Sequence, residues 1–505
     1  MAAFLVRLLR RLRIVPSRGG IALNNDAARA FQQGDDDQAI DLFSQAIAET
    51  PQFAEAYINR ARVWHKKGEY PRALEDSETA VRLAPRNALA YSSRGAVLFD
   101  SGQADRALAD FDHAIELDSF LTDAYVNRGF LHLNQGDLKR AAADFDAAIR
   151  QEPGRASSFR GRALVRTLLG DRAGSLVDLE QALMLDPHCV PALVDRAKLR
   201  MHEGNLDATL RDLDEALRLA PQNADARLVR ARVRRRQGDL NGARHDLDEA
   251  VRLDPRNHLN YFERGMMAFG AGDEIAALKD FNEAIRLRPN AAQGFFGRGQ
   301  VQQRQGAFAK ALSDYDTALD LDPRLAIGYS SRGLLLQQLG EMERAAADLD
   351  RAVELQPENA VALNNRGFLL EALGDYAHAV VDYEQAIRFA PDHPNAHKNL
   401  AWLLATCVDG RFRDGVRALE HIQQALELCQ WGNPAWLEIL AAAHAEAGHF
   451  AAAVEWQNKA IEQNPGPSHD ELQTRLELYR AGQAFHGGPS ACSGMTVAQN
   501  PSAWR

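Results

Sequence analysis

The sequence predicts an all-α solenoid, a linear stack of helical hairpins in which each hairpin packs on the next. Glycine stands at every multiple of 34 from Gly34 to Gly374. Proline recurs with the same period from Pro51 to Pro391, and Ser119 fills the one exceptional slot. A fixed period of this length indicates units that bury their apolar faces against their neighbours.

Each unit is predicted to be two helices joined by a glycine turn. We number a unit from 1 to 34 with the turn glycine at position 15, so the fourth unit spans 122–155. Small residues at positions 8, 20 and 27 let two antiparallel helices approach closely. Positions 4 and 24 usually carry large side chains that fill the space between helices at i, i+3 and i+4 spacings. The turn glycine, Gly136 in this unit, allows the left-handed conformation that ends a helix, and Pro153 ends the second helix.

This pattern resembles the tetratricopeptide repeat, which shares the 34-residue period, the small residues at 8, 20 and 27, and proline at 32. The resemblance covers residues 20 to about 467 as thirteen units, of which eleven are regular (20–393) and two divergent (394–467). Thr209 departs from the pattern at position 20, and the twelfth unit needs about five extra residues between its helices. The resemblance implies a right-handed α-solenoid.

A solenoid must cover its last exposed face. After Pro465 the sequence predicts a capping helix over residues 468–484, begun by a capping box of Ser468 and Glu471. Residues 485–505 lack an apolar period, so we expect a disordered tail.

Two charged positions recur near the buried stripes. Position 7 is arginine and position 23 is aspartate in units two to eleven, and both are lost together in the other three units. We therefore predict structural ion pairs between the two helices of one unit, including Arg128–Asp144, Arg196–Asp212 and Arg298–Asp314. Losing one partner of a buried pair is costly, so Asp212→Ala is expected to destabilise the fold more than Asp212→Ala with Arg196→Leu.

Two other pairings were weighed for this aspartate. Pairing with the next unit's arginine leaves Arg60 facing Leu42 and Asp382 facing Leu400. Pairing with a base four residues earlier fails in four units, which carry glycine or alanine there. Position 25 is also acidic in most of these units, and we interpret it as forming local solvent-face pairs such as Glu78–Arg82, Asp146–Arg150 and Asp248–Arg252.

Composition and motifs argue against enzyme chemistry. The sequence holds no GxSxG, HExxH, P-loop or dinucleotide-binding glycine motif, so we expect no enzyme, no cofactor and no metal. The four cysteines lie far apart and form no zinc or disulfide pattern. Cys407, near Arg411 and Arg413, is the closest approach to an activated thiol, and a core position is the favoured interpretation.

The first fifteen residues, MAAFLVRLLRRLRIV, are basic and amphipathic. Within a predicted N-terminal segment of residues 1–19, they suit a membrane-surface helix or a mitochondrial-type targeting segment, and a helix that caps the first unit is the alternative. We expect a cytoplasmic protein with peripheral membrane contact through residues 1–15, and mitochondrial-type targeting as the second possibility.

Binding is the function that remains. The resemblance implies that first-helix positions 2, 5, 9, 12 and 13 line a concave surface that holds a peptide or a partner helix. In units five to seven these positions carry the following basic residues: Arg160, Lys198, His202, Arg232, Arg235 and Arg236. A basic strip favours acidic partner segments, and arginine as an ordinary solvated helix former is the alternative.

The sequence therefore predicts a non-catalytic scaffold that binds proteins or peptides. The carboxylate clamp of chaperone-binding relatives is not matched, because Lys398 stands with Trp402 where the clamp needs asparagine. The alternative function is a regulatory or substrate-selecting subunit of an enzyme carried on another chain. The formal net charge of −10 argues against nucleic acid.

Overall fold

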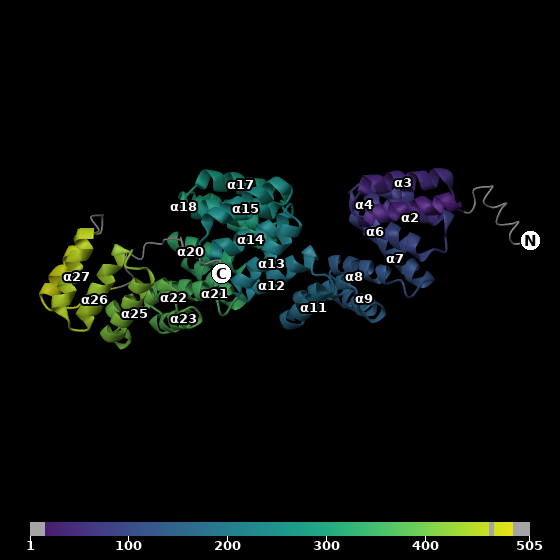
Figure 1. Cartoon of the computed structure of the whole chain (residues 1–505). Helices are drawn as coiled ribbons and strands as arrows, with labels where there is room; N and C mark the ends of the chain where they lie inside the picture. The colour runs from purple at the N-terminus through teal and green to yellow at the C-terminus, as the bar shows by residue number, and fades with distance from the viewer. Residues whose placement is uncertain (1–15, 464–468, 488–505) are drawn as a thin grey trace, which may run out of the picture. The chain divides into compact units, whose positions relative to one another are not determined.

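The computed structural model describes residues 16–463 and 469–487, and these residues form helices and no strands (Figure 1). The chain divides into two compact units, residues 1–233 and 234–505, each described here by itself. Residues 1–15 of the predicted N-terminal segment 1–19 lie outside the described residues, as does Ser468. The predicted all-helical repeat architecture is confirmed.

The helices follow one another as hairpins. Those that begin in the first compact unit are α2 (Arg18–Gln32), α3 (Asp36–Glu49), α4 (Ala54–Lys66), α5 (Tyr70–Leu83), α6 (Ala88–Asp100), α7 (Ala104–Leu117), α8 (Thr122–Asn134), α9 (Leu138–Gln151), α10 (Ala156–Leu168), α11 (Arg172–Leu185), α12 (Val190–His202), α13 (Leu206–Leu219) and α14 (Ala224–Arg236). The second unit continues with α15 (Leu240–Leu253), α16 (His258–Gly270), α17 (Glu274–Leu287), α18 (Ala292–Arg304), α19 (Phe308–Leu321), α20 (Ala326–Gln338), α21 (Met342–Leu355), α22 (Ala360–Ala372), α23 (Tyr376–Phe389), α24 (Pro394–Thr406), α25 (Gly415–Leu428), α26 (Leu437–Glu446), α27 (Phe450–Gln463) and α28 (His469–Arg480), with 3-10 turns η1 (Gly410–Phe412) and η2 (Pro434–Trp436).

Local sequence sets each hairpin, as in the fourth repeat. Gly136 has φ of 80°, a conformation that favours glycine, and so reverses the chain after α8. The side chain of Asp137 then caps α9 by accepting a hydrogen bond from the Arg140 amide at 2.9 Å. Ala141 and Ala148 are fully buried where α9 meets its neighbours.

The first helices of successive repeats also pack on one another, for example α8 on α6 and α10. The first helices therefore form a continuous layer from α2 to α10 and another from α16 to α26. We call the surface formed by first-helix positions 2, 5, 9, 12 and 13 the inner face.

The arginine at position 7 forms a bidentate ion pair with the aspartate of its own repeat. Arg128 donates from Nε and Nη2 to the two carboxylate oxygens of Asp144, at 3.0 and 2.7 Å. The aspartate side chains are 3–9% exposed and the arginines 18–28%. The same pair forms in every regular repeat whose two partners lie in one compact unit: Arg60–Asp76, Arg94–Asp110, Arg128–Asp144, Arg162–Asp178, Arg196–Asp212, Arg264–Asp280, Arg298–Asp314, Arg332–Asp348 and Arg366–Asp382.

The third guanidinium nitrogen reaches the preceding repeat, which corrects the interpretation of position 25. Arg162 Nη1 donates to Asp146 at 2.9 Å, and Arg264 Nη1 to Asp248 at 3.1 Å. The expected local pairs are wrong: these acids contact the next repeat's arginine, and Arg252 instead bonds Glu249. The same link to the preceding repeat joins Arg128 to Asp112, Arg230 to Asp214, Arg332 to Asp316 and Arg366 to Asp350, while Arg60 and Arg298 reach Ser44 and Asn282.

The position-4 side chain completes the surroundings of this arginine. The Arg128 guanidinium carbon lies 5.6 Å from the centroid of the Tyr125 ring, within the range of a cation–π contact. Hydrogen bonding to Asp110 raises the pKa of Arg94 above its ordinary value, so this charge persists at any pH the fold meets. Each such arginine therefore ties together both helices of its own repeat and, where position 25 accepts, the preceding repeat.

The divergent twelfth repeat replaces this ion pair with two histidines. His397 Nε2 donates to the carbonyl of Pro391 at 3.1 Å, so its Nδ1 accepts from His421 Nδ1, also at 3.1 Å. Burial, and then the neighbouring His397, lower the pKa of His421 to about 4. The connection between α24 and α25 runs from Cys407 to Asp414, where a regular repeat needs only Gln135 to Asp137.

The capping helix α28 is held by a buried charge. Arg475 pairs with Glu438 of α26, and its guanidinium lies over the rings of Trp402 and Phe485. The chain then folds back, so that the Gly487 amide donates to the Thr406 carbonyl at 2.9 Å. The expectation of disorder from residue 485 is therefore wrong for residues 485–487. Phe485 packs against Trp402, although the sequence there has no apolar period. The rest of the predicted tail lies outside the described residues.

The ion pairs between positions 7 and 23 of successive repeats form a ladder. Removing the arginine of one such pair should destabilise the fold by a different amount than removing its aspartate. We expect Arg94→Leu to lower the free energy of unfolding by about 2 kcal/mol or more, because it leaves the buried Asp110 unpaired. Asp110→Ala should cost less, since Arg94 keeps access to water, and the double variant should be more stable than Arg94→Leu. Denaturant melts of the three variants measure this order. The Asp212 test is less clean, because Arg200 also donates to Asp212 at 2.8 Å.

The twelfth repeat should lose stability in acid. Because its pKa is lowered, folded His421 takes up fewer protons than the unfolded chain, so stability falls as pH drops from about 6.5 to about 4. His421→Gln should reduce this slope by up to about 1.4 kcal/mol per pH unit. Hydrogen exchange of α24 and α25 at several pH values measures it, with exposed His245→Gln as control. Equal acid sensitivity in His421→Gln and wild type would contradict the assignment.

Candidate protein-interaction surface

The inner face of the fifth and sixth repeats, on α10 and α12, brings together three of the predicted binding residues. Arg160 Nε donates to Asp195 at 2.7 Å, and Lys198 Nζ lies 2.8 Å from Asp225. His202 is exposed at the end of α12. The two predicted cations are therefore already paired with carboxylates of the next repeat.

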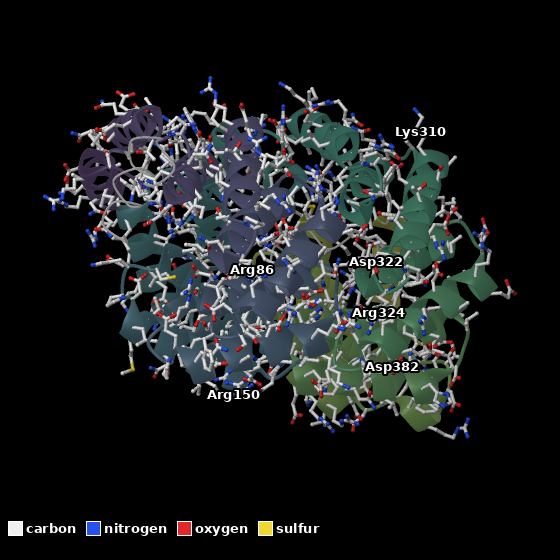
Figure 2. All side chains as sticks on the ribbon, turned by 90° about the vertical axis from the view of Figure 1, so that its right-hand side faces the viewer. Arg86, Arg150, Lys310, Asp322, Arg324 and Asp382 are labelled. Atoms are coloured by element: carbon white, nitrogen blue, oxygen red, sulfur yellow. The ribbon has the colours of Figure 1, made fainter. Side chains whose placement is uncertain are left out.

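Among the predicted arginines of α14, Arg235 also lies near a carboxylate of the following repeat. Arg235 lies 3.5 Å from Glu263 of α16, while Arg232 and Arg236 occupy positions 9 and 13 of α14. Charges of both signs are interspersed over the array, as between Asp322 and Arg324 in the connection from α19 to α20 (Figure 2). The carboxylates beside Arg160, Lys198 and Arg235 weaken the case for a purely cationic strip.

A pocket of about 220 Å³ opens on this inner face between α10 and α12. Its depth is formed by the buried residues Ala163, Ser175, Leu179 and Leu199. The remaining lining side chains are those of Leu164, Thr167, Asp195, Lys198 and His202. Two residues of the predicted binding set, Lys198 and His202, thus lie on the lining of a pocket.

The polar groups in the depth of this pocket already bond one another. Ser175 Oγ donates to the Ala163 carbonyl at 2.8 Å, and the same oxygen lies 2.8 Å from Thr167 Oγ1. Asp178, next to Leu179 in sequence, accepts from both Arg162 and Arg166. The pocket therefore offers an apolar wall whose few polar atoms are already bonded.

Sequence reasoning missed Thr167, Leu179 and Asp195. A signal was present, since position 24 carries leucine in this repeat and an aromatic ring in five regular repeats after the first. Asp195 stands at position 6, which the concave set of positions does not include.

The described residues contain no group of three or more potential metal ligands. Burial raises the pKa of the Cys407 thiol, which is opposite to the change that activates a nucleophile. Within residues 16–463 and 469–487, no helix is long and apolar enough to cross a membrane.

Comparison with known families identifies the class of protein. Tetratricopeptide repeat models match residues 27–78, 67–121, 126–187, 194–258, 228–274 and 262–326, then 327–359 and 360–393. The chain therefore belongs to the tetratricopeptide repeat family, as the resemblance predicted. Its tandem repeats support a protein-interaction scaffold. No curated protein matches the chain.

A solved structure shows the same fold. The chain is similar to a chain of the APC/C hetero-tetramer Cut9–Hcn1, with 16% sequence identity and a TM-score of 0.59 over 91% of this chain and 96% of that one. A tetratricopeptide repeat protein from Parabacteroides merdae aligns at 19% identity and a TM-score of 0.41, over 49% of this chain and 98% of that one.

Proposed function

We propose that the chain is a non-catalytic scaffold whose inner face captures an extended segment of a partner protein. The observation that carries this proposal is the pocket between α10 and α12, because it opens where the family's partner-binding positions fall. Ligand sites in proteins are concave, largely apolar and bear a few placed polar groups, and this pocket has that composition.

The charge pattern refines the kind of partner. A partner carboxylate approaching Arg160 or Lys198 competes with Asp195 or Asp225, which already neutralise those cations. Acidic segments thus gain little from these two side chains. We propose that apolar contacts supply most of the affinity, and that the paired charges at the pocket set the register of the bound segment.

A matched pair of substitutions in one repeat tests the inner face. Leu168 at inner-face position 13 and Val177 on the second helix α11 are each 63% exposed, so aspartate should be tolerated at both. We expect Leu168→Asp to weaken partner binding at least tenfold and Val177→Asp to leave it unchanged. Affinity capture from a lysate of the source cells, with the full chain as bait and quantified binding of each captured protein, measures the difference.

The pattern of loss decides the outcome. Capture that is lost only with Leu168→Asp supports the inner face. Partners lost equally with Val177→Asp, or with neither variant, would place binding elsewhere and overturn the proposal.

A further inference from the structure

The aromatic residue at position 24 has a defined place in the repeats that carry it. In the ninth repeat a Cβ built on Gly299, at position 8, would lie 2.8 Å from Tyr315 Cε1. The hydroxyl of Tyr315 donates to Gln303, at position 12, at 2.7 Å. In the eleventh repeat Tyr383 likewise donates to Glu371, again at position 12, at 2.8 Å. The ring therefore lies beside positions 8 and 12 of its own first helix.

The ring also reaches the following repeat. Phe145 lies against Gly129, at position 8 of its own repeat, and against Gly161, at position 6 of the next. Phe281 lies in the same way against Gly265 and Gly297. The ring at position 24 thus lies beside positions 8 and 12 of its own repeat and position 6 of the next.

In the fifth repeat these four positions line the pocket instead. They are Ala163, Thr167 and Leu179, with Asp195 from the sixth repeat. Leucine is shorter than phenylalanine or tyrosine, and threonine at position 12 is too small to replace the lost ring. The pocket lies where the ring lies in the ring-bearing repeats, with Ala163 in place of the glycine that those repeats carry at position 8 from the third repeat onward. Alanine is compatible with a ring there, since Ala27 and Phe43 of the first repeat are buried in one cluster.

The fifth repeat is exceptional in having both positions small. The other regular repeats without a ring at position 24 carry a large side chain at position 12: His65, Met201, Arg235 and Gln337 in the second, sixth, seventh and tenth repeats. Met201 and Gln337 are buried there. Within the regular array, this combination belongs to one site on the inner face.

The chemistry of the lining selects the occupant. Ser175 and Thr167 bond each other and the Ala163 carbonyl, so a polar guest finds those groups already engaged. Asp195 is neutralised by Arg160, and Lys198 by Asp225, so the charges beside the opening favour no single sign. A volume of about 220 Å³ exceeds the roughly 150 Å³ that holds a benzene molecule in an apolar cavity.

We propose that this pocket binds one large apolar side chain, a ring or a long aliphatic chain, projecting from an extended segment of a partner protein. The inference rests on the proposed function and specifies its anchor residue. The guest side chain takes the place of the ring missing from position 24, and its backbone runs across the inner face beside Lys198 and His202.

Filling the pocket from within tests the proposal. Leu179→Phe places a ring at position 24, and Thr167→Gln at an exposed position puts a larger side chain over the opening. Leu213→Phe in the sixth repeat is the matched control, since Ala197 at position 8 matches Ala163, and Met201 at position 12 already packs in one buried cluster with Leu213. We expect Leu179→Phe to keep or raise the melting temperature and Leu213→Phe to lower it.

Binding is measured with peptides selected from a displayed random library against the full chain. Peptides that depend on the inner face, judged by loss with Leu168→Asp, should carry one large apolar residue. Its change to alanine, Leu179→Phe and Thr167→Gln should each weaken binding about 10- to 100-fold, and Leu213→Phe should not.

The outcomes separate the two proposals. Peptides that need Leu168 yet bind Leu179→Phe and Thr167→Gln as well as wild type would overturn the anchor pocket and leave the inner face standing. A lower melting temperature in Leu179→Phe than in Leu213→Phe would show that the space is not available to a ring, and also overturns the pocket. Failure to select any peptide that depends on Leu168 would overturn the proposed function and this inference with it.

Discussion

The whole array depends on one side chain, the arginine at position 7. Its guanidinium presents three nitrogens in a fixed plane, and two of them grip the aspartate of the same repeat while the third reaches the repeat before. Helix pairing and repeat stacking are thereby set by the same group. A lysine in this position has a single charged nitrogen and no planar fork, which explains why the ten regular repeats from the second onward use arginine throughout.

The same ion pairs border the pocket. Asp178 is the residue before Leu179, and it pairs with Arg162 and Arg166 of α10. These contacts hold α11 against α10 beside the pocket. Where the ladder ends, in the twelfth repeat, a histidine pair and a large apolar cluster around Trp402 and Leu440 replace it.

The sequence was sufficient for the contacts made within one repeat. The hairpins, their glycine turns and the in-repeat arginine–aspartate contacts follow from periodicity, because a residue type that recurs at one position implies one environment. It was insufficient where a side chain contacts a residue outside its own repeat. Position 25 was predicted to form local helix pairs, Arg160 and Lys198 were predicted to belong to a basic strip, and Phe485 was predicted to belong to a disordered tail. Leu179 shows a further limit: a conservative exchange of ring for leucine has no charge or motif to mark it, and its consequence depends on the size of Thr167.

The most direct test of the account is a double-mutant cycle across a repeat boundary, between Asp316 of the ninth repeat and Arg332 of the tenth, which are joined at 2.6 Å. Local unfolding free energies of α20 are measured by native-state hydrogen exchange in Asp316→Ala, Arg332→Ala and the double variant. The account predicts a coupling free energy of at least about 0.5 kcal/mol. Additivity within about 0.3 kcal/mol would contradict it, because the arginine would then stabilise its own repeat without joining it to the one before.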